Sequence, residues 1–431
     1  MDRRKLLIIA AIIIVFIILI LIFGLRTDKK PKPITLEFWS VYDDRVNYSE
    51  AIEEYQKANK HVTIKYEKKS FTEYEQELIN ALAAGEGPDI FTIHHTWLSK
   101  HEDKISPMPQ EGEEFYSAKI FKDTFVDVAY QDLVKNERIY GLPMYVDTLA
   151  LYYNKDFFNS AGIPSVPETW DEFLNDVEVL TTKDSGGNIK RAGAAIGTAE
   201  NVNRSTDILS LLMLQTGAEM TNNDDTQATF NQRVNLDGES FMPGKDALRF
   251  YTDFSNPTKR IYCWNRQMPY SIDAFYEGRA AMMINYSYHI DTIRAKSPYL
   301  NFGVAPMPQI KNRNFDVNYA NYWAHTVSKN SDKVDEAWKF LIFLAKKENV
   351  QKYLEKSKRP TARRDLIEWQ RENSDLNVFA NQSLSARSWY QADNQSIEKI
   401  FADMVKSVVL GEANLEEAIN KAANQVTLLM R

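Results

Sequence analysis

The sequence contains very little cysteine: Cys263 is the only one in 431 residues. A single cysteine excludes an internal disulfide framework, so the fold depends on the packing of its core alone. The sequence also lacks the phosphate-binding P-loop, GxGxxG, HExxH and GxSxG motifs. No internal repeat or low-complexity tract is present. These absences argue against the common nucleotide-dependent, zinc-dependent and serine-nucleophile enzymes.

Excess positive charge and metal-ligand clusters are missing as well. The formal net charge of -7 argues against a nucleic-acid-binding surface. His94 and His95 are adjacent on a predicted strand end, where their side chains tend to point apart. The acidic stretch at residues 222–225 lacks the glycine and the distal glutamate of a calcium loop. We therefore expect no nucleic-acid partner, no metal and no cofactor.

One long apolar run stands out, from Leu6 to Leu25, and it contains no charged or strongly polar side chain. Twenty helical residues span about 30 Å, the thickness of a membrane's hydrocarbon core. A cleavable signal peptide has a shorter apolar region and a small-residue cleavage site, which Phe23–Arg26 does not offer. A lipoprotein signal needs a cysteine directly after the run. The run predicts an uncleaved transmembrane anchor at 6–25, with a head at 1–5 and a linker at 26–33.

The charges that flank the run do not decide its orientation, because basic residues lie on both sides of it. We expect a cytoplasmic N-terminus and an extracytoplasmic body, mainly because of the function argued below. The body of about 400 residues is too large for one ordinary core and predicts two domains. Its first part alternates strands and helices, for example a strand at Ile34–Phe38 and a helix that a capping box at Thr72 opens and Gly85 ends. Further along, a second capping box at Thr169 predicts the start of another helix, and apolar residues at helical spacing predict a last helix over 415–429. This alternation is typical of an α/β domain with a largely parallel sheet.

Five further patterns occur in a characteristic order along the body. They are Thr35–Trp39, Gly85–Phe91, Tyr140–Ile163 with the following Pro167–Phe173, Phe275–Met282 and Phe302–Pro308. Together they resemble the extracellular solute-binding proteins of the maltose-binding type, which supply ABC importers. The chain departs from that family's pattern at its start, where neither a cleavable signal nor a lipid-modified cysteine is evident.

The resemblance implies an α/β fold of the two-lobed periplasmic-binding-protein-like type (type II), with a ligand held in the cleft. On this mapping lobe 1 is 34–146 plus about 304–346, and lobe 2 is 147–303 plus about 347–431. The resemblance also implies a carbohydrate ligand, captured by lobe closure and presented to an ABC permease by a monomer.

A sugar needs flat aromatic surfaces for its C–H faces and fixed polar groups for its hydroxyls. The ligand-facing segments implied by the resemblance carry such side chains. The candidate ligand-binding residues are Trp39, Asp43, Thr96, Trp97, Asp147, Asn201, Asn285, Tyr288, Trp323 and Trp389.

Each candidate has a structural alternative, since tryptophans commonly pack in cores. Asp43 can cap the following helix, and Asp147 can be a hinge residue satisfied by backbone donors. Other ligands also stay open, because acidic groups such as Asp43, Asp147 and Glu200 can hold a cationic amine or a peptide amino terminus. A membrane-anchored enzyme acting on glycans is a further alternative, because the separation of paired carboxylates is spatial and cannot be read from sequence. Nothing singles out such a pair, and we predict a binding protein that is not an enzyme.

Overall fold

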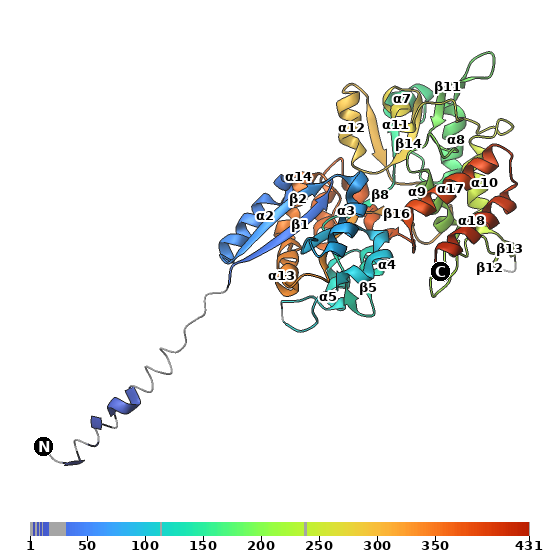
Figure 1. Cartoon of the computed structure of the whole chain (residues 1–431). Coiled ribbons are helices and arrows are strands. Elements are labelled where there is room, and N and C mark those ends of the chain that lie inside the picture. The colour runs from blue at the N-terminus through green and yellow to red at the C-terminus, as the bar shows by residue number, and fades with distance from the viewer. Residues whose placement is uncertain are drawn as a thin grey trace.

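The computed structural model describes residues 32–112, 114–236 and 239–430, together with residues 3–4, 7, 9–10 and 12–16. These residues confirm the predicted two-lobed α/β architecture (Figure 1). Most of the predicted anchor, Leu6 to Leu25, lies outside the described residues. Within the described part of the chain, no helix is both long and apolar enough to cross a membrane.

Lobe 1 is built on a six-stranded sheet with the order β2-β1-β3-β17-β4, and β7 lies beside β17. The first three strands are parallel, whereas β17 comes from much later in the chain and inserts antiparallel to β3. Apolar residues such as Leu36 and Phe38 are fully buried on this sheet. The strands are β1 (Ile34–Val41), β2 (Val62–Lys69), β3 (Ile90–His94), β4 (Ile105–Ser106), β7 (Leu142–Pro143) and β17 (Trp323–Ser328).

Helices from both ends of the body cover this sheet, and Figure 1 shows the late α13 and α14 beside the early α2. One helix start differs from the prediction: no side chain caps α3, and the Glu75 carboxylate instead binds Lys100 and His101. The predicted stop at Gly85 is confirmed, because Gly85 has the left-handed φ of 75° that favours glycine. The helices are α2 (Arg45–Ala58), α3 (Phe71–Ala84), α4 (Leu98–His101), α5 (Ala118–Thr124), α6 (Asp127–Leu133), α13 (Val334–Leu344), α14 (Lys347–Ser357) and α15 (Ile367–Arg371).

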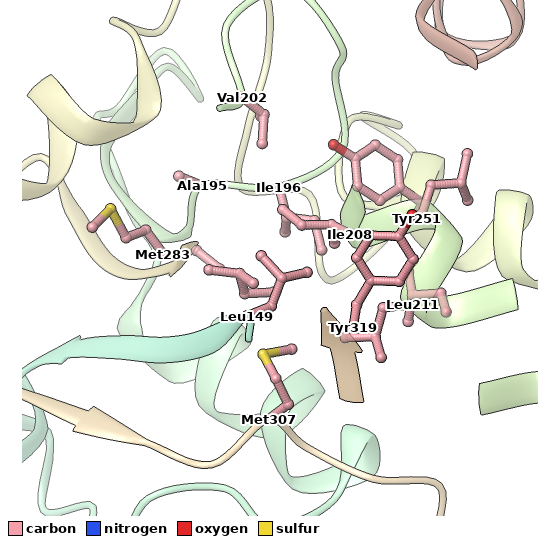
Figure 2. Close-up of a cluster of buried hydrophobic side chains, with 14 of the residues drawn as sticks. Leu149, Ala195, Ile196, Val202, Ile208, Leu211, Tyr251, Met283, Met307 and Tyr319 are labelled. Carbon is pink, nitrogen blue, oxygen red and sulfur yellow. The ribbon is translucent and has the colours of Figure 1, made fainter. Parts of the chain in front are cut away.

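Lobe 2 has a mixed five-stranded sheet with the order β10-β11-β14-β9-β15. Only β11 and β14 pair in parallel; the neighbouring pairs are antiparallel. Leu149, Met283 and Met307 belong to one buried cluster that also includes residues of α9 and α10 (Figure 2). The strands are β9 (Ala150–Asn154), β10 (Thr182–Lys183), β11 (Ile189–Ala194), β14 (Ala280–Asn285) and β15 (Phe302–Ala305).

The helices of lobe 2 again come from two parts of the chain. Thr169 forms the predicted capping box at the start of α8, and the predicted C-terminal helix over 415–429 is confirmed as α18. Helices α17 and α18 pack against α10. The helices are α7 (Lys155–Ala161), α8 (Trp170–Leu180), α9 (Ser205–Thr216), α10 (Pro243–Asp253), α11 (Ser271–Tyr276), α12 (His289–Lys296), α16 (Asn377–Gln382), α17 (Asn394–Val409) and α18 (Leu415–Leu429).

A small three-stranded sheet joins the lobes, formed by β8 (Asp147–Thr148), β16 (Asn318–Asn321) and β18 (Ala386–Arg387). The chain changes lobe near each of these strands. Residues that are close in sequence there belong to different cores: Val146, Ala320 and Ala386 pack in lobe 1, and Leu149, Tyr319 and Trp389 pack in lobe 2.

The core packing differs from the predicted division in two segments. Residues 304–317 were expected in lobe 1, yet Ala305 and Met307 pack in the core of lobe 2. Residues from 347 onward were expected in lobe 2, yet Val350 and Leu354 of α14 pack in the core of lobe 1. The chain therefore crosses between the lobes later than the sequence pattern suggested.

Candidate functional site

A cavity of about 580 Å³ lies between the two lobes, beside the joining sheet. Its volume falls in the range of small-molecule sites. Both lobes contribute to its walls. The lining residues from lobe 1 are Tyr42, Phe71, His94, His95, Thr96, Trp97, Tyr145, Trp323 and Arg359, and those from lobe 2 and the joining strands are Asp147, Arg204, Asp207, Tyr288, Tyr319, Asn321, Gln391, Asn394, Gln395 and Glu398.

The wall formed by lobe 1 is mainly aromatic. Tyr42 directly follows β1, and its ring stacks on that of Phe71 at the start of α3, with 5.2 Å between the ring centroids. Trp323 packs edge-on against both rings. Tyr42 and Phe71 are 45% and 48% exposed, whereas Trp323 is only 8% exposed. Tyr42 and Phe71 thus present the more accessible aromatic surface, and Trp323, which also lines the cavity, contacts both rings edge-on.

His94 and Thr96 are neutral polar groups of the lobe 1 wall. The His94 ring nitrogen Nδ1 lies 2.7 Å from the Thr96 hydroxyl. Burial, together with neighbouring His95 and Arg204, holds the pKa of His94 well below its usual range. His94 is therefore uncharged near neutral pH and can both donate and accept hydrogen bonds.

Arg359 adds a positive charge to this wall, but Asp43 sits 3.3 Å from it. Asp43 also accepts hydrogen bonds from the hydroxyls of Tyr48 and Tyr353. The Arg359 guanidinium lies over the ring of Tyr145, 4.2 Å from its centroid. Asp43 and Tyr145 together fix Arg359 at the cavity.

The wall formed by lobe 2 is charged. Arg204 donates two hydrogen bonds to the Tyr288 hydroxyl, at 3.1 and 2.9 Å. Asp207, in the first turn of α9, accepts a hydrogen bond from the Tyr286 hydroxyl at 2.8 Å. Arg204 itself precedes α9 with a left-handed φ of 61°. A non-glycine residue in this conformation costs about 1–2 kcal/mol, and such strain is concentrated at ligand clamps and active sites.

Two carboxyl groups at the cavity titrate close to neutral pH. Burial and the neighbouring charge of Asp207 raise the pKa of Glu398 to about 7, although Arg204 acts in the opposite direction. Burial also raises the pKa of Asp147 to about 7, against the hydrogen bonds that it accepts from Ser287 and Thr148. The charge of the cavity therefore changes across the physiological pH range.

The structure places five of the ten predicted ligand-binding residues at the cavity: Thr96, Trp97, Asp147, Tyr288 and Trp323. Asp147 also fits its alternative as a hinge residue, because it lies in β8 and accepts the backbone N–H groups of Ser287 and Thr148 as well as the Ser287 hydroxyl. Contact of these five cavity residues with a ligand stays a prediction.

Three of the other five do not line the cavity because their side chains have different partners. Trp39 lies on β1 with the Lys69 ammonium 3.6 Å from its ring centroid. Trp389 is buried in the core of lobe 2, where it stacks on Phe401. Asp43 is the partner of Arg359 described above rather than a lining residue.

The remaining two, Asn201 and Asn285, are asparagines whose amides are used within lobe 2. Asn201 donates to the carbonyls of Asn265 and Met268 and accepts from the Trp264 indole N–H. Asn285 is fully buried and donates to the Asn203 side chain. Asn201 lies in the loop that ends at Arg204, Asn285 contacts that loop through Asn203, and neither residue lines the cavity.

Sequence reasoning missed Tyr42, Phe71, Arg204, Arg359 and Glu398. Tyr42 adjoins the predicted Asp43, and Arg204 follows the polar loop that contains the predicted Asn201. Both missed neighbours have positive φ angles, which direct their side chains into the cavity and cannot be read from residue type. The pattern thus located the correct loops, but the backbone conformation selected other side chains within them.

Comparison with known proteins identifies similar chains. A profile described as "Bacterial extracellular solute-binding protein" matches residues 43–351. The galactooligosaccharide-binding protein of Bacillus subtilis is 22% identical over 84% of this chain and 82% of its own length. The multiple sugar-binding protein of Streptococcus mutans is 23% identical over 78% of this chain and 77% of its own length.

Solved structures share the fold. A cyclo/maltodextrin-binding protein complexed with maltotetraose superimposes with a TM-score of 0.74 and 20% identity, covering 92% of this chain and 97% of that chain. A sugar-binding protein of Xanthomonas citri gives a TM-score of 0.76 and 18% identity over the same shares.

Proposed function

Because the chain belongs to the bacterial extracellular solute-binding protein family, we propose that it captures a carbohydrate, a mono- or oligosaccharide, in the cavity between its lobes. The names of similar proteins support this ligand class, since they bind galactooligosaccharides, multiple sugars and maltotetraose. Binding without turnover fits the same family.

The observation that carries the proposal is that a mainly aromatic wall on lobe 1 faces a charged wall on lobe 2. The Tyr42–Phe71 surface suits the apolar C–H face of a sugar ring, with Tyr288 standing on the opposite wall. Arg204 and Glu398 supply a charged donor and a charged acceptor for hydroxyl groups at the ring's edge. Neutral His94 and Thr96 add further hydrogen-bonding groups.

Capture proceeds by closure of the lobes. A ligand that contacts both walls stabilises the closed arrangement relative to the open one, and the closed surface is then recognised by a permease. The joining sheet of β8, β16 and β18 is the place where the backbone must bend.

The apolar run Leu6–Leu25 supports a further part of the proposal, an anchor that keeps an extracytoplasmic body close to the permease. Membrane fractionation of the full chain, compared with a chain lacking residues 6–25, tests it. Release of the shortened protein into the soluble fraction is expected. An equal distribution of the two chains between the fractions would contradict the anchor.

The ligand test is a thermal-shift screen of the full chain, followed by calorimetric titration of every hit. The detergent must lack a sugar head group, because an alkyl maltoside could itself occupy the cavity. We expect stabilisation by one or more saccharides and none by polyamines, amino acids or peptides. Stabilisation by an amine or peptide alone would reject the carbohydrate proposal, and release of shortened glycans would instead indicate an enzyme.

A further inference from the structure

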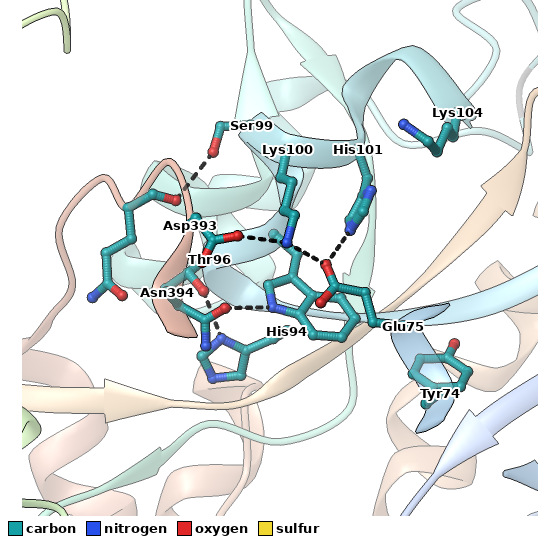
Figure 3. A network of polar contacts seen from close by, with 12 residues as sticks. Tyr74, Glu75, His94, Thr96, Ser99, Lys100, His101, Lys104, Asp393 and Asn394 are labelled. Atoms are coloured by element: carbon teal, nitrogen blue, oxygen red, sulfur yellow. Dashed lines mark hydrogen bonds and ion pairs between the residues drawn. The ribbon is translucent and has the colours of Figure 1, made fainter. Parts of the chain in front are cut away.

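A set of polar contacts joins lobe 1 to the segment that leads from β18 into α17 (Figure 3). The Trp97 indole N–H donates to the Asn394 Oδ1 at 2.9 Å. The Lys100 Nζ lies 2.7 Å from the Asp393 Oδ2. The Ser99 hydroxyl donates to the Gln391 carbonyl at 3.4 Å. All three contacts cross between the lobes at one edge of the cavity.

Lys100 is held in place within its own lobe. Its ammonium group also contacts the Glu75 Oε1 at 2.7 Å, and the same oxygen lies 2.9 Å from the His101 Nε2. The Lys100 side chain is only 29% exposed, and that of Asp393 only 28%. A partly buried ion pair with fixed partners is screened less by salt than an exposed one.

The two carboxylate oxygens of Asp393 make different contacts, one within α17 and one with lobe 1. Its Oδ1 accepts the Ser396 backbone N–H at 2.8 Å and so caps α17. Its Oδ2 binds Lys100 of the other lobe. The first turns of α17 carry Asn394, Gln395 and Glu398 to the cavity.

We propose that Asp393 is a positioning residue whose ion pair with Lys100 holds the first turns of α17 against lobe 1 before ligand arrives. Asn394 and Glu398 then face the aromatic wall in advance, which reduces the ordering cost of binding. The consequence for affinity rests on the proposed carbohydrate-binding function. The positioning itself does not depend on the ligand.

The simpler alternative is that Asp393 only caps its helix. Asp393→Asn separates the cap from the ion pair, because asparagine caps helices about as well as aspartate but cannot form the ion pair. Lys100→Met removes the same pair from the other lobe and leaves the cap intact. Lys104→Met is the matched control, since Lys104 contacts Asp103 within lobe 1 at 2.8 Å.

The first experiment measures the distance between the lobes in the ligand-free full chain. Spin labels are placed through Val46→Cys on lobe 1 and Tyr299→Cys on lobe 2, two positions that are 61% and 98% exposed. Cys263 stays unlabelled because it is buried, and burial raises the pKa of its thiol to about 12. Lys100→Met and Asp393→Asn should both broaden or shift the distance distribution, whereas Lys104→Met should not. Unchanged distributions in the first two variants would overturn the proposal.

The second experiment measures affinity for a saccharide that the unmodified chain binds. Lys100→Met and Asp393→Asn should each weaken binding by about two- to fivefold, and the double variant should be no weaker than Lys100→Met, because Asp393 has already lost its partner in that variant. The difference from the unmodified chain should shrink in 1 M salt, where the screening length is about 3 Å. Equal affinities at low salt would overturn the link to binding. If the unmodified chain bound no saccharide, the proposed function would fail, and the distance measurement would still decide the positioning role.

Discussion

The two walls of the cavity differ in chemistry. Among the described lining residues, Arg359 is the permanently charged group of the lobe 1 wall, and Asp43 balances it. The lobe 2 wall carries Arg204, Asp207 and Glu398, of which Glu398 titrates near neutral pH. One wall therefore offers apolar area and the other offers directed, charged hydrogen bonds. We expect lobe 1 to set how strongly a ring surface is held, and lobe 2 to set which hydroxyl pattern is accepted.

Among the variants that test this division of roles between the walls, removal of Arg204 should have the largest effect on saccharide affinity. Arg204→Gly should weaken saccharide binding by about tenfold to a hundredfold, since hydrogen bonds to charged groups contribute about 1.5–3 kcal/mol. The melting temperature of the ligand-free chain should change little, because relief of the left-handed backbone strain offsets the two hydrogen bonds to Tyr288 that are lost. Calorimetric titration and a thermal melt measure the two effects. A drop in stability that matched the loss of binding would mean that Arg204 is mainly structural.

Removal of the flat surface on lobe 1 comes next. Phe71→Ala should weaken binding by up to about tenfold, because an aromatic contact contributes about 0.5–1.5 kcal/mol. Phe71→Tyr keeps the ring and should bind like the unmodified chain. Val46→Ala is the control, because Val46 is an exposed apolar residue of lobe 1 that does not line the cavity. If Phe71→Ala bound the saccharide as tightly as the unmodified chain, the lobe 1 wall would not bind the ligand by ring stacking.

The pH dependence of binding should arise from lobe 2. Glu398 accepts hydrogen bonds best when ionised, so affinity should fall a few-fold as the pH decreases through about 7, the pKa of Glu398. Binding at pH 7 should accordingly release protons. The groups that surround Glu398 are Asp207 and Arg204 of lobe 2 and Tyr42 of lobe 1.

Titrations from pH 6 to pH 8 test this dependence, with Glu398→Gln expected to reduce the slope and to leave only the contribution of Asp147, whose pKa is also about 7. His94→Gln is the comparison on the other wall, and it should leave the slope unchanged because His94 is already neutral in this range. If His94→Gln flattened the pH profile of binding and Glu398→Gln did not, the pH dependence would come from lobe 1 rather than from lobe 2.

The smallest effect is expected at a residue that sequence reasoning placed in the site. Trp39→Phe should alter affinity by less than about twofold, because Trp39 does not line the cavity. It should lower the free energy of unfolding by up to about 1 kcal/mol through a weaker contact with Lys69. A large loss of affinity would show that the ligand extends beyond the cavity.

Much of the fold was predictable because its signals are local. The β1 strand, the stop at Gly85, the capping box at Thr169 and the helix over 415–429 all depend on neighbouring residues. The start of α3 was not predictable, since Glu75 has capping-box spacing but binds Lys100 and His101 instead. Glu75 therefore contacts side chains that are distant in sequence instead of the backbone at the start of its own helix.

The loops of the site were predictable, but only five of the ten predicted side chains line the cavity. Thr96 and Trp97 were found because they directly follow β3. Arg359 could not be found, since it reaches the cavity only through Asp43 and Tyr145, far away in sequence. Arg204 depends on a left-handed backbone that the surrounding loop enforces.

The insertion of β17 into the sheet of lobe 1 has a consequence for biosynthesis. β1 begins at Ile34, but the sheet is incomplete until β17, Trp323–Ser328, has been made and paired with β3. Lobe 2 in turn needs α17 and α18 from the end of the chain. Neither lobe can finish folding during early synthesis, and such long-range pairing is slow. The edge of β3 that pairs with β17 therefore stays open until about three quarters of the chain has been made, and unpaired strand edges of this kind favour aggregation during folding.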